Sequence, residues 1–119
     1  MQLNFTDLEY INRRKKTRRE ILLEEMDVLL PWDKWEEMVQ PYYPSGIRGR
    51  KPQSINRMLR MFMLRTWFSL SDLGAEEEVY DSYSMKQFMK IDFSLNDQVP
   101  DSTTLCKFRS LLKKHGLDT

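Results

Sequence analysis

Hydrophobic positions recur with helical spacing along most of the chain, and the clearest run lies at its centre. Residues 54–68, SINRMLRMFMLRTWF, contain no Gly, Pro or acid, and most of them favour a helical backbone. One stripe at i, i+3, i+4 and i+7 spacing comprises Ile55, Met58, Leu59, Phe62 and Thr66. Because other large apolar residues occupy the remaining sides, the sequence predicts a central helix that its neighbours bury on several faces.

Polar residues mark the ends of this central helix and interrupt its apolar surface. Ser54 can cap the first turn, and residues 69–72 are compatible with a turn. The apolar surface also carries Arg57, Arg60 and Arg65. Each of these arginines must reach the surface, pair with an acid or meet phosphate.

Two shorter helices are predicted before the central one. The first ends at Pro31, and the second, in which Asp33 and Glu36 have capping-box spacing, ends at Pro41. The apolar side expected of the first helix is Leu22, Met26, Leu29 and Leu30. The buried side expected of the second is Trp35, Met38 and Val39.

Two short helices are predicted after the central one, over residues 72–81 and from about Ser84. The residues expected to face the central helix are Leu73, Val79, Tyr80, Met85, Phe88, Met89 and Ile91. The five acids of residues 72–81 favour a solvated face over a catalytic cluster, because Glu76, Glu77 and Glu78 are adjacent and point in different directions. Residues 93–98 read as a turn-rich spacer.

The last helix has the clearest boundaries after the central one. Asp101 or Ser102 can cap its start, and Gly116 is placed to end it. Its buried stripe is predicted to be Leu105, Phe108 and Leu112. The whole chain is therefore expected to form one all-α domain over residues 1–119: a compact bundle of about five to six helices with a helix-turn-helix-like unit, after an irregular lead-in over residues 1–12.

Composition narrows the function classes. The single cysteine, Cys106, excludes an intrachain disulfide, and no Cys/His cluster has zinc-ligand spacing. We therefore expect no metal, no cofactor and no catalytic residue. The N-terminus lacks the basic and apolar regions of a signal peptide, and no apolar run approaches membrane-spanning length, so a cytoplasmic location without membrane contact is expected.

Charge is distributed unevenly even though the net charge is only +1. Residues 44–65 contain six bases and no acid, whereas residues 72–81 contain five acids and no base. A locally basic surface can bind a polyanion whatever the net charge, because affinity depends on the phosphates that are contacted.

Two basic segments are candidate DNA contacts. The first is the basic cluster of residues 13–19, which comprises Arg13, Arg14, Lys15, Lys16, Arg18 and Arg19. It lies at a helix N-terminus or just before it, where the helix dipole disfavours cations. The alternative is pairing with Glu20 and Glu24. The second is the breaker-rich loop of residues 41–52. Its glycines allow close phosphate approach, and its charge comes from Arg48, Arg50 and Lys51. The alternative is a surface crossing whose tyrosines pack on the core.

The last helix is the third candidate. Its polar residues Ser102, Thr103, Thr104, Lys107 and Arg109 resemble what a recognition helix presents to the major groove, with its first amides free to meet phosphate. Two alternatives remain open: the helix is simply a capped final helix of the bundle, or Arg109 pairs internally with an acid of residues 72–81.

Five strings occur in an order that resembles a known family. They are Leu30, Pro31 and Trp32; Tyr43 and Pro44 with Gly49, Arg50, Lys51 and Pro52; Met58, Leu59 and Arg60; Trp67, Phe68, Ser69, Leu70, Ser71 and Asp72; and Pro100, Asp101, Ser102, Thr103 and Thr104 with Phe108, Arg109 and Leu112. Together they resemble the N-terminal domain of bacterial transposases of the insertion-sequence-five type.

That resemblance implies a helical domain that binds double-stranded DNA at the terminal inverted repeats of a mobile element, in the bacterial cytoplasm and close to the nucleoid. It also implies that cleavage and strand transfer belong to a downstream ribonuclease-H-like domain with an Asp, Asp, Glu triad. This chain is expected to lack that domain and hence enzyme activity, and a homo-oligomer or a separate catalytic polypeptide is a possible partner. The rival interpretation is a protein interaction module or a truncated regulator of a full-length transposase.

Overall fold

The computed structural model describes residues 15–44 and 53–117, which are helical with no strand among them. The elements are α2 (Arg18–Leu29), α3 (Trp32–Val39), η1 (Gln40–Tyr42), α4 (Ile55–Trp67), α5 (Asp72–Asp81), α6 (Tyr83–Phe88), η2 (Phe93–Leu95) and α7 (Ser102–Lys114), where η marks a 3-10 turn. These six α-helices confirm the predicted fold class for the described part of the chain.

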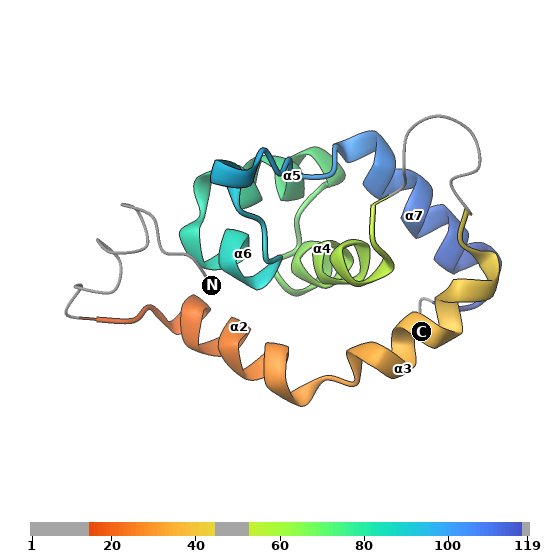
Figure 1. The fold of residues 1–119 in the computed structure, drawn as a ribbon, viewed down its shortest axis with the longest axis horizontal. Helices are drawn as coiled ribbons and strands as arrows, with labels where there is room; N and C mark the ends of the chain where they lie inside the picture. The colour runs from red at the N-terminus through yellow and green to blue at the C-terminus, as the bar shows by residue number, and fades with distance from the viewer. Residues whose placement is uncertain (1–14, 45–52, 118–119) are drawn as a thin grey trace.

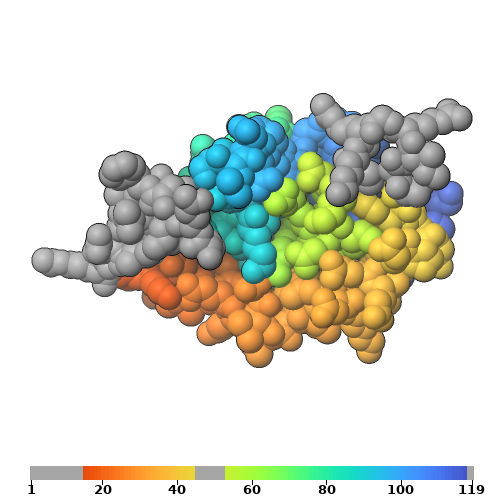
Figure 2. All heavy atoms as spheres, in the orientation of Figure 1, coloured from red at the N-terminus to blue at the C-terminus, as the bar shows by residue number. Residues whose placement is uncertain are grey.

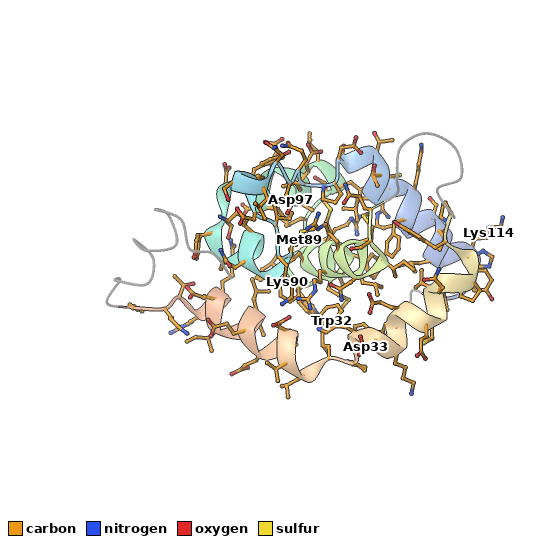
Figure 3. The ribbon with its side chains drawn as sticks, in the orientation of Figure 1. Trp32, Asp33, Met89, Lys90, Asp97 and Lys114 are labelled. Carbon is orange, nitrogen blue, oxygen red and sulfur yellow. The ribbon has the colours of Figure 1, made fainter. Side chains whose placement is uncertain are left out.

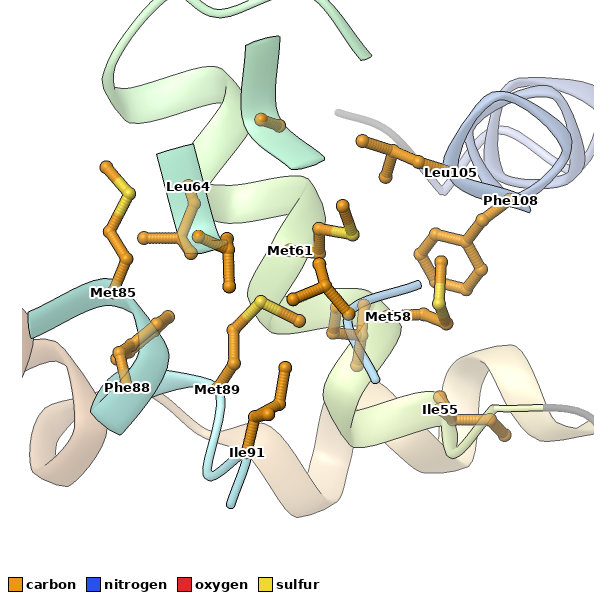
Figure 4. Close-up of a cluster of buried hydrophobic side chains, with 14 of the residues drawn as sticks. Ile55, Met58, Met61, Leu64, Met85, Phe88, Met89, Ile91, Leu105 and Phe108 are labelled. Carbon is orange, nitrogen blue, oxygen red and sulfur yellow. The ribbon is translucent and has the colours of Figure 1, made fainter. Parts of the chain in front are cut away.

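Helix α4 lies at the centre, as its sequence predicts. Helices α3, α5 and α7 pack against it from different sides, and α2 packs mainly on α6 (Figure 1). Met58, Met61 and Leu64 of α4 are fully buried, and they meet Phe88 and Phe108 of the neighbouring helices in one apolar cluster (Figure 4). Methionine suits such a junction because its flexible side chain fills irregular gaps.

Local capping sets the beginnings of the main helices. The Ser54 hydroxyl accepts a hydrogen bond from the Arg57 amide at 3.1 Å, and the Ser71 hydroxyl accepts one from the Gly74 amide at 2.9 Å. Gly116 follows α7 with a φ of 67°, a conformation that favours glycine. The predicted boundaries of α4, α5 and α7 are therefore confirmed.

The predicted apolar side of α2 is correct only in part: Met26 and Leu30 pack against the core and Leu22 is half-buried, but Leu29 is exposed. Leu23 is the buried residue of this helix, whereas Leu29 is 71% exposed and Val28 is 80% exposed. The space-filling view shows α2 and α3 as a band along one edge of the molecule (Figure 2). A helix at an edge buries only the side that meets its neighbour, and the pattern of α2 fits two sides about equally well.

The predicted capping box at the start of α3 is also wrong. Pro31 occupies the N-cap position and makes no side-chain cap, so Trp32 rather than Asp33 begins the helix. Partial burial, and next the neighbouring Asp33 carboxylate, raise the pKa of Glu36. Met38, predicted to be buried, is half-exposed.

Two residues of α5 also depart from prediction. Leu73 and Tyr80 are exposed, although both were expected to face α4. The other five residues expected to face inward are buried: Val79, Met85, Phe88, Met89 and Ile91. Helix α5 therefore presents an apolar surface to solvent as well as to the core.

A buried arginine fixes the position of α2 and α3 on α4. The Arg60 guanidinium pairs with Asp27 at 2.7 Å, and it donates to Asn56 at 2.7 Å and to the Phe88 carbonyl at 2.8 Å. It also lies over the rings of Trp32 and Phe88. The Trp32 indole donates to the Asp27 carbonyl, so the junction between α2 and α3 is held beneath α4 (Figure 3).

All three arginines of α4 pair with acids, which decides among the alternatives that the sequence leaves open. Besides Arg60, Arg57 reaches Asp97 at 3.5 Å and Arg65 reaches Asp72 at 2.9 Å. The central helix thus uses its cations to bind neighbouring elements.

Candidate nucleic-acid interface

Carboxylates occupy the N-terminus of α7. Asp101 accepts a hydrogen bond from the Thr104 amide at 2.8 Å, and Glu76 of α5 accepts one from the Ser102 amide at 2.7 Å. Both negative charges complement the positive end of the helix dipole. Protein carboxylates already use two of these first amides, Ser102 and Thr104, which counts against the prediction that they meet phosphate.

The Asp72 carboxylate of α5 binds arginines of α4 and α7, and it is the internal partner of Arg109. The Arg109 guanidinium donates to both Asp72 oxygens, from Nε at 2.8 Å and from Nη2 at 2.6 Å, while Arg65 of α4 donates to Oδ1 at 2.9 Å. The hydrogen bond from Arg109 is the largest of the influences that lower the pKa of Asp72. Of the two roles foreseen for Arg109, the structure shows the internal ion pair.

The sequence favoured a solvated face for the acids of α5, but several of these acids bind neighbouring elements. Asp72 and Glu76 hold α7 through the bonds just described, and Glu78 pairs with Arg19 of α2 at 3.3 Å. Three of the five carboxylates therefore connect elements, and they fix the side of α7 that faces away from α5.

That outer side of α7 is cationic. Its exposed residues recur at helical spacing: Thr103, Cys106, Lys107, Ser110, Lys113 and Lys114. No acid occurs between residues 102 and 117. We call these six residues the α7 lysine face, and Lys114 marks its outer end (Figure 3).

The five α7 residues predicted to contact DNA separate into two groups. Thr103 and Lys107 are exposed on the α7 lysine face, whereas Ser102, Thr104 and Arg109 are half-buried. The prediction omitted Cys106, Ser110, Lys113 and Lys114. These four residues could have been found from the sequence, because they lie on the helix face opposite the buried stripe of Leu105, Phe108 and Leu112.

The N-terminal basic segment is only partly within the described residues. Lys15 is exposed, and Lys16 pairs with Glu24 at 3.0 Å on the surface, as the alternative interpretation foresaw. An exposed pair of this kind contributes little to stability and leaves the cation accessible. Arg13 and Arg14 lie outside the described residues.

Arg48, Arg50 and Lys51 of the predicted phosphate-binding loop also lie outside the described residues. The residues on either side of that segment are ordered together, because the Tyr43 hydroxyl donates to the Gln53 carbonyl and burial raises the pKa of Tyr43. Both residues line a hollow of about 460 Å³ whose wall includes Lys107. The described residues on either side of residues 45–52 therefore lie beside α7.

The tyrosines before that segment both pack against α7. Tyr43 meets the Phe108 ring edge-on with centroids 6.2 Å apart, and Tyr42 stacks on His115 at 3.8 Å. The packing on the core foreseen as the alternative is thus present for Tyr43, whereas Tyr42 is exposed and stacks on the exposed His115.

Within the described ranges, no three His, Cys, Asp or Glu side chains gather where they could hold a metal ion. No described helix is long and apolar enough to cross a membrane. The exposed side chains along α7 can form hydrogen bonds and ionic contacts with a ligand.

Comparison with known proteins identifies the family. No solved structure matches the chain. Residues 10–111 match the family model described as "Transposase domain (DUF772)". The match covers every described helix except the last few residues of α7. The chain therefore belongs to this transposase-domain family.

Proposed function

We propose that this chain is a DNA-binding domain that acts in transposition by recognising the terminal inverted repeats of an insertion sequence of the insertion-sequence-five type. The observation that carries the proposal is the α7 lysine face, an acid-free cationic helix surface in a member of a transposase family. In this proposal the domain binds DNA and the strand chemistry is done elsewhere.

Each residue type of the α7 lysine face has a role in this proposal. Lys107, Lys113 and Lys114 neutralise backbone phosphates, which positions the helix without reading sequence. Thr103 and Ser110 are small and polar, so they let the helix approach base edges in the major groove and can hydrogen-bond there. The carboxylates of Asp101 and Glu76 repel phosphate, which places the contact toward the middle and C-terminal half of α7.

The helix-turn-helix unit stays a prediction, and the proposed DNA-contacting helix α7 lies outside the two helices that best fit it. Only residues 68–71 separate α4 from α5, a connection short enough for such a unit. The five acids of α5 would repel DNA, however, whereas α7 carries none. On charge alone, α7 is therefore a more favourable DNA-contacting helix than α5.

Fluorescence anisotropy with labelled duplexes tests the proposal. One duplex carries the inverted repeat that flanks the coding region, the other is scrambled, and both are titrated across a salt series. Tighter binding to the repeat is expected, with a salt slope that falls by about 0.9 for each lysine of the face changed to Ala. The matched control is Lys34→Ala, an exposed lysine on α3. Absence of binding to either duplex at low salt would refute the proposal.

A second candidate, a protein interaction module, rests on the apolar groove between α3, α4 and α7. The groove measures about 290 Å³, and its walls include Trp35, Phe62, Met63 and Leu117. A complex formed mainly through apolar contact would respond little to salt, so the same salt series separates the two functions.

A further inference from the structure

The outer side of α5 combines exposed apolar side chains with free carboxylates. Leu73, Glu77, Tyr80 and Asp81 follow one another at i, i+4, i+7 and i+8, so they share one face of the helix. All four are exposed, and the two apolar ones are 54% and 44% exposed. A soluble domain has no need to present such a stripe unless something binds it.

The turn η2 extends this surface. The Tyr80 and Phe93 rings stack with centroids 5.6 Å apart and planes 8° apart, and Leu95 of the same turn is 69% exposed. Lys86 is buried, with its ammonium over the Phe93 ring. We call Leu73, Glu77, Tyr80, Asp81, Phe93 and Leu95 the α5 stripe. The aromatic pair is held in place by its own packing, so binding would order few side chains.

The charges available on the α5 stripe are negative. Asp72, Glu76 and Glu78 are committed to Arg109, Ser102 and Arg19, as described above. Glu77 and Asp81 have no ion-pair partner among the described residues, and the nearby cation of Lys86 is covered. A ligand of this surface therefore has to offer cations next to apolar side chains.

We propose that the α5 stripe is a docking surface for a basic amphipathic helix of a partner protein. Such a helix would lay its apolar side chains on Tyr80, Phe93 and Leu95 and its lysines or arginines against Glu77 and Asp81. DNA has the wrong charge for this surface. The proposal goes beyond DNA binding and does not depend on it.

A second copy of the chain offers a poorer match among its described helices. The α7 lysine face carries cations but no large exposed apolar side chain. Helix α2 has exposed Ile21 and Val28, but Glu24 and Glu25 lie between them on the same side and would face the carboxylates of the stripe. Neither α7 nor α2 therefore offers the basic amphipathic face that the α5 stripe would bind.

Fluorescence anisotropy with model helices tests this docking surface on the full chain. The probe is a labelled synthetic peptide of Leu and Lys, about five helical turns long, with amphipathic spacing. One comparison peptide has Glu in place of Lys, and the other has the same composition in an order without helical periodicity. The variants are Tyr80→Ala with Leu95→Ser, and Glu77→Gln with Asp81→Asn. Their matched controls on α2 are Val28→Ser with Leu29→Ser, and Glu24→Gln with Glu25→Gln.

The expected result is saturable binding of the basic amphipathic peptide alone. Each pair of substitutions in the α5 stripe should weaken it by on the order of tenfold, while the control pairs change it less than about twofold. Equal weakening by the α2 controls, or equal binding of the scrambled peptide, would overturn the proposal. So would self-association of the chain that Tyr80→Ala abolishes. Duplex affinity measured on the same variants should change less than about twofold, so failure of peptide docking is distinguishable from failure of DNA binding.

Discussion

At the scale of single residues, Arg60 shows how a charge becomes part of the core. Its guanidinium satisfies Asp27, Asn56 and the Phe88 carbonyl while two aromatic rings cover its faces. A buried charge is tolerated when its hydrogen bonds are made, and its loss is costly because the partner charge stays behind. Arg60 therefore acts as the link between α4 and the junction of α2 and α3.

Replacing Arg60 by Ala should destabilise the fold by about 3 kcal/mol, because the buried Phe88 carbonyl loses its donor and half-buried Asp27 keeps only the more distant Lys90 at 3.7 Å. The control is Arg57→Ala, which removes a more exposed pair with Asp97 and should cost at most about 1 kcal/mol. Urea unfolding followed by circular dichroism measures both free energies. Equal costs would contradict the role given to Arg60.

Asp72 makes stability depend on acid pH. Its pKa is lowered in the folded state, chiefly by the hydrogen bond from Arg109. The stabilisation is therefore present above the unfolded-state pKa of about 3.9 and is lost as pH falls through the lower folded-state pKa. The free energy of unfolding of Asp72→Asn should differ from that of the wild type most at neutral pH. The difference should shrink below about pH 4, and a constant difference would count against this ion pair.

At the scale of elements, the ends of α4, α5 and α7 were predictable from sequence, whereas the start of α3 and the buried faces of α2 and α5 were predicted less well. Ser54, Asp101 and Gly116 act through atoms within a few residues along the chain, and the structure places them as expected. Whether Leu23 or Leu29 of α2 is buried depends on where α6 lies, which the local pattern does not contain. The Asp27 and Phe88 partners of Arg60 were likewise beyond sequence reasoning because they lie far along the chain, whereas the pairing of Arg109 with an acid of residues 72–81 was one of the two foreseen roles.

The candidate interface was predictable to the same extent. The sequence correctly singled out α7 as a capped helix with a polar outer side. It attributed the first amides to phosphate, although Glu76 from another helix takes one of them. The prediction omitted Lys113 and Lys114, although they lie opposite the stripe of Leu105, Phe108 and Leu112 that the sequence predicted.

Removing negative charge from the start of α7 should strengthen DNA binding. Asn is as good an N-cap as Asp, so Asp101→Asn keeps the cap at Thr104 and removes a charge that repels phosphate. We expect duplex affinity at low salt to rise by about two- to fivefold, with the gain disappearing in high salt. Asp81→Asn, the same change at the far end of α5, should have a smaller effect. Affinity that stays constant in both variants would indicate that DNA binds elsewhere.

At the scale of the whole molecule, opposite charges lie on neighbouring helices. Helix α7 carries no acid and helix α5 carries no base, yet the two pack together through Asp72 and Arg109 (Figure 1). A polyanion and a basic protein segment would each have one favourable side to approach. The domain could then bind DNA through the α7 lysine face while the α5 stripe remains free for a partner.

The most direct test of DNA binding by α7 uses Cys106, the single cysteine of the chain, which is exposed in the middle of the α7 lysine face. The rate of its alkylation by a maleimide is measured with and without a saturating duplex that carries the inverted repeat. Contact of the α7 lysine face with DNA predicts strong slowing by the duplex, reversed when salt is raised. An unchanged rate while anisotropy shows the duplex to be bound would contradict the assignment of the interface to α7.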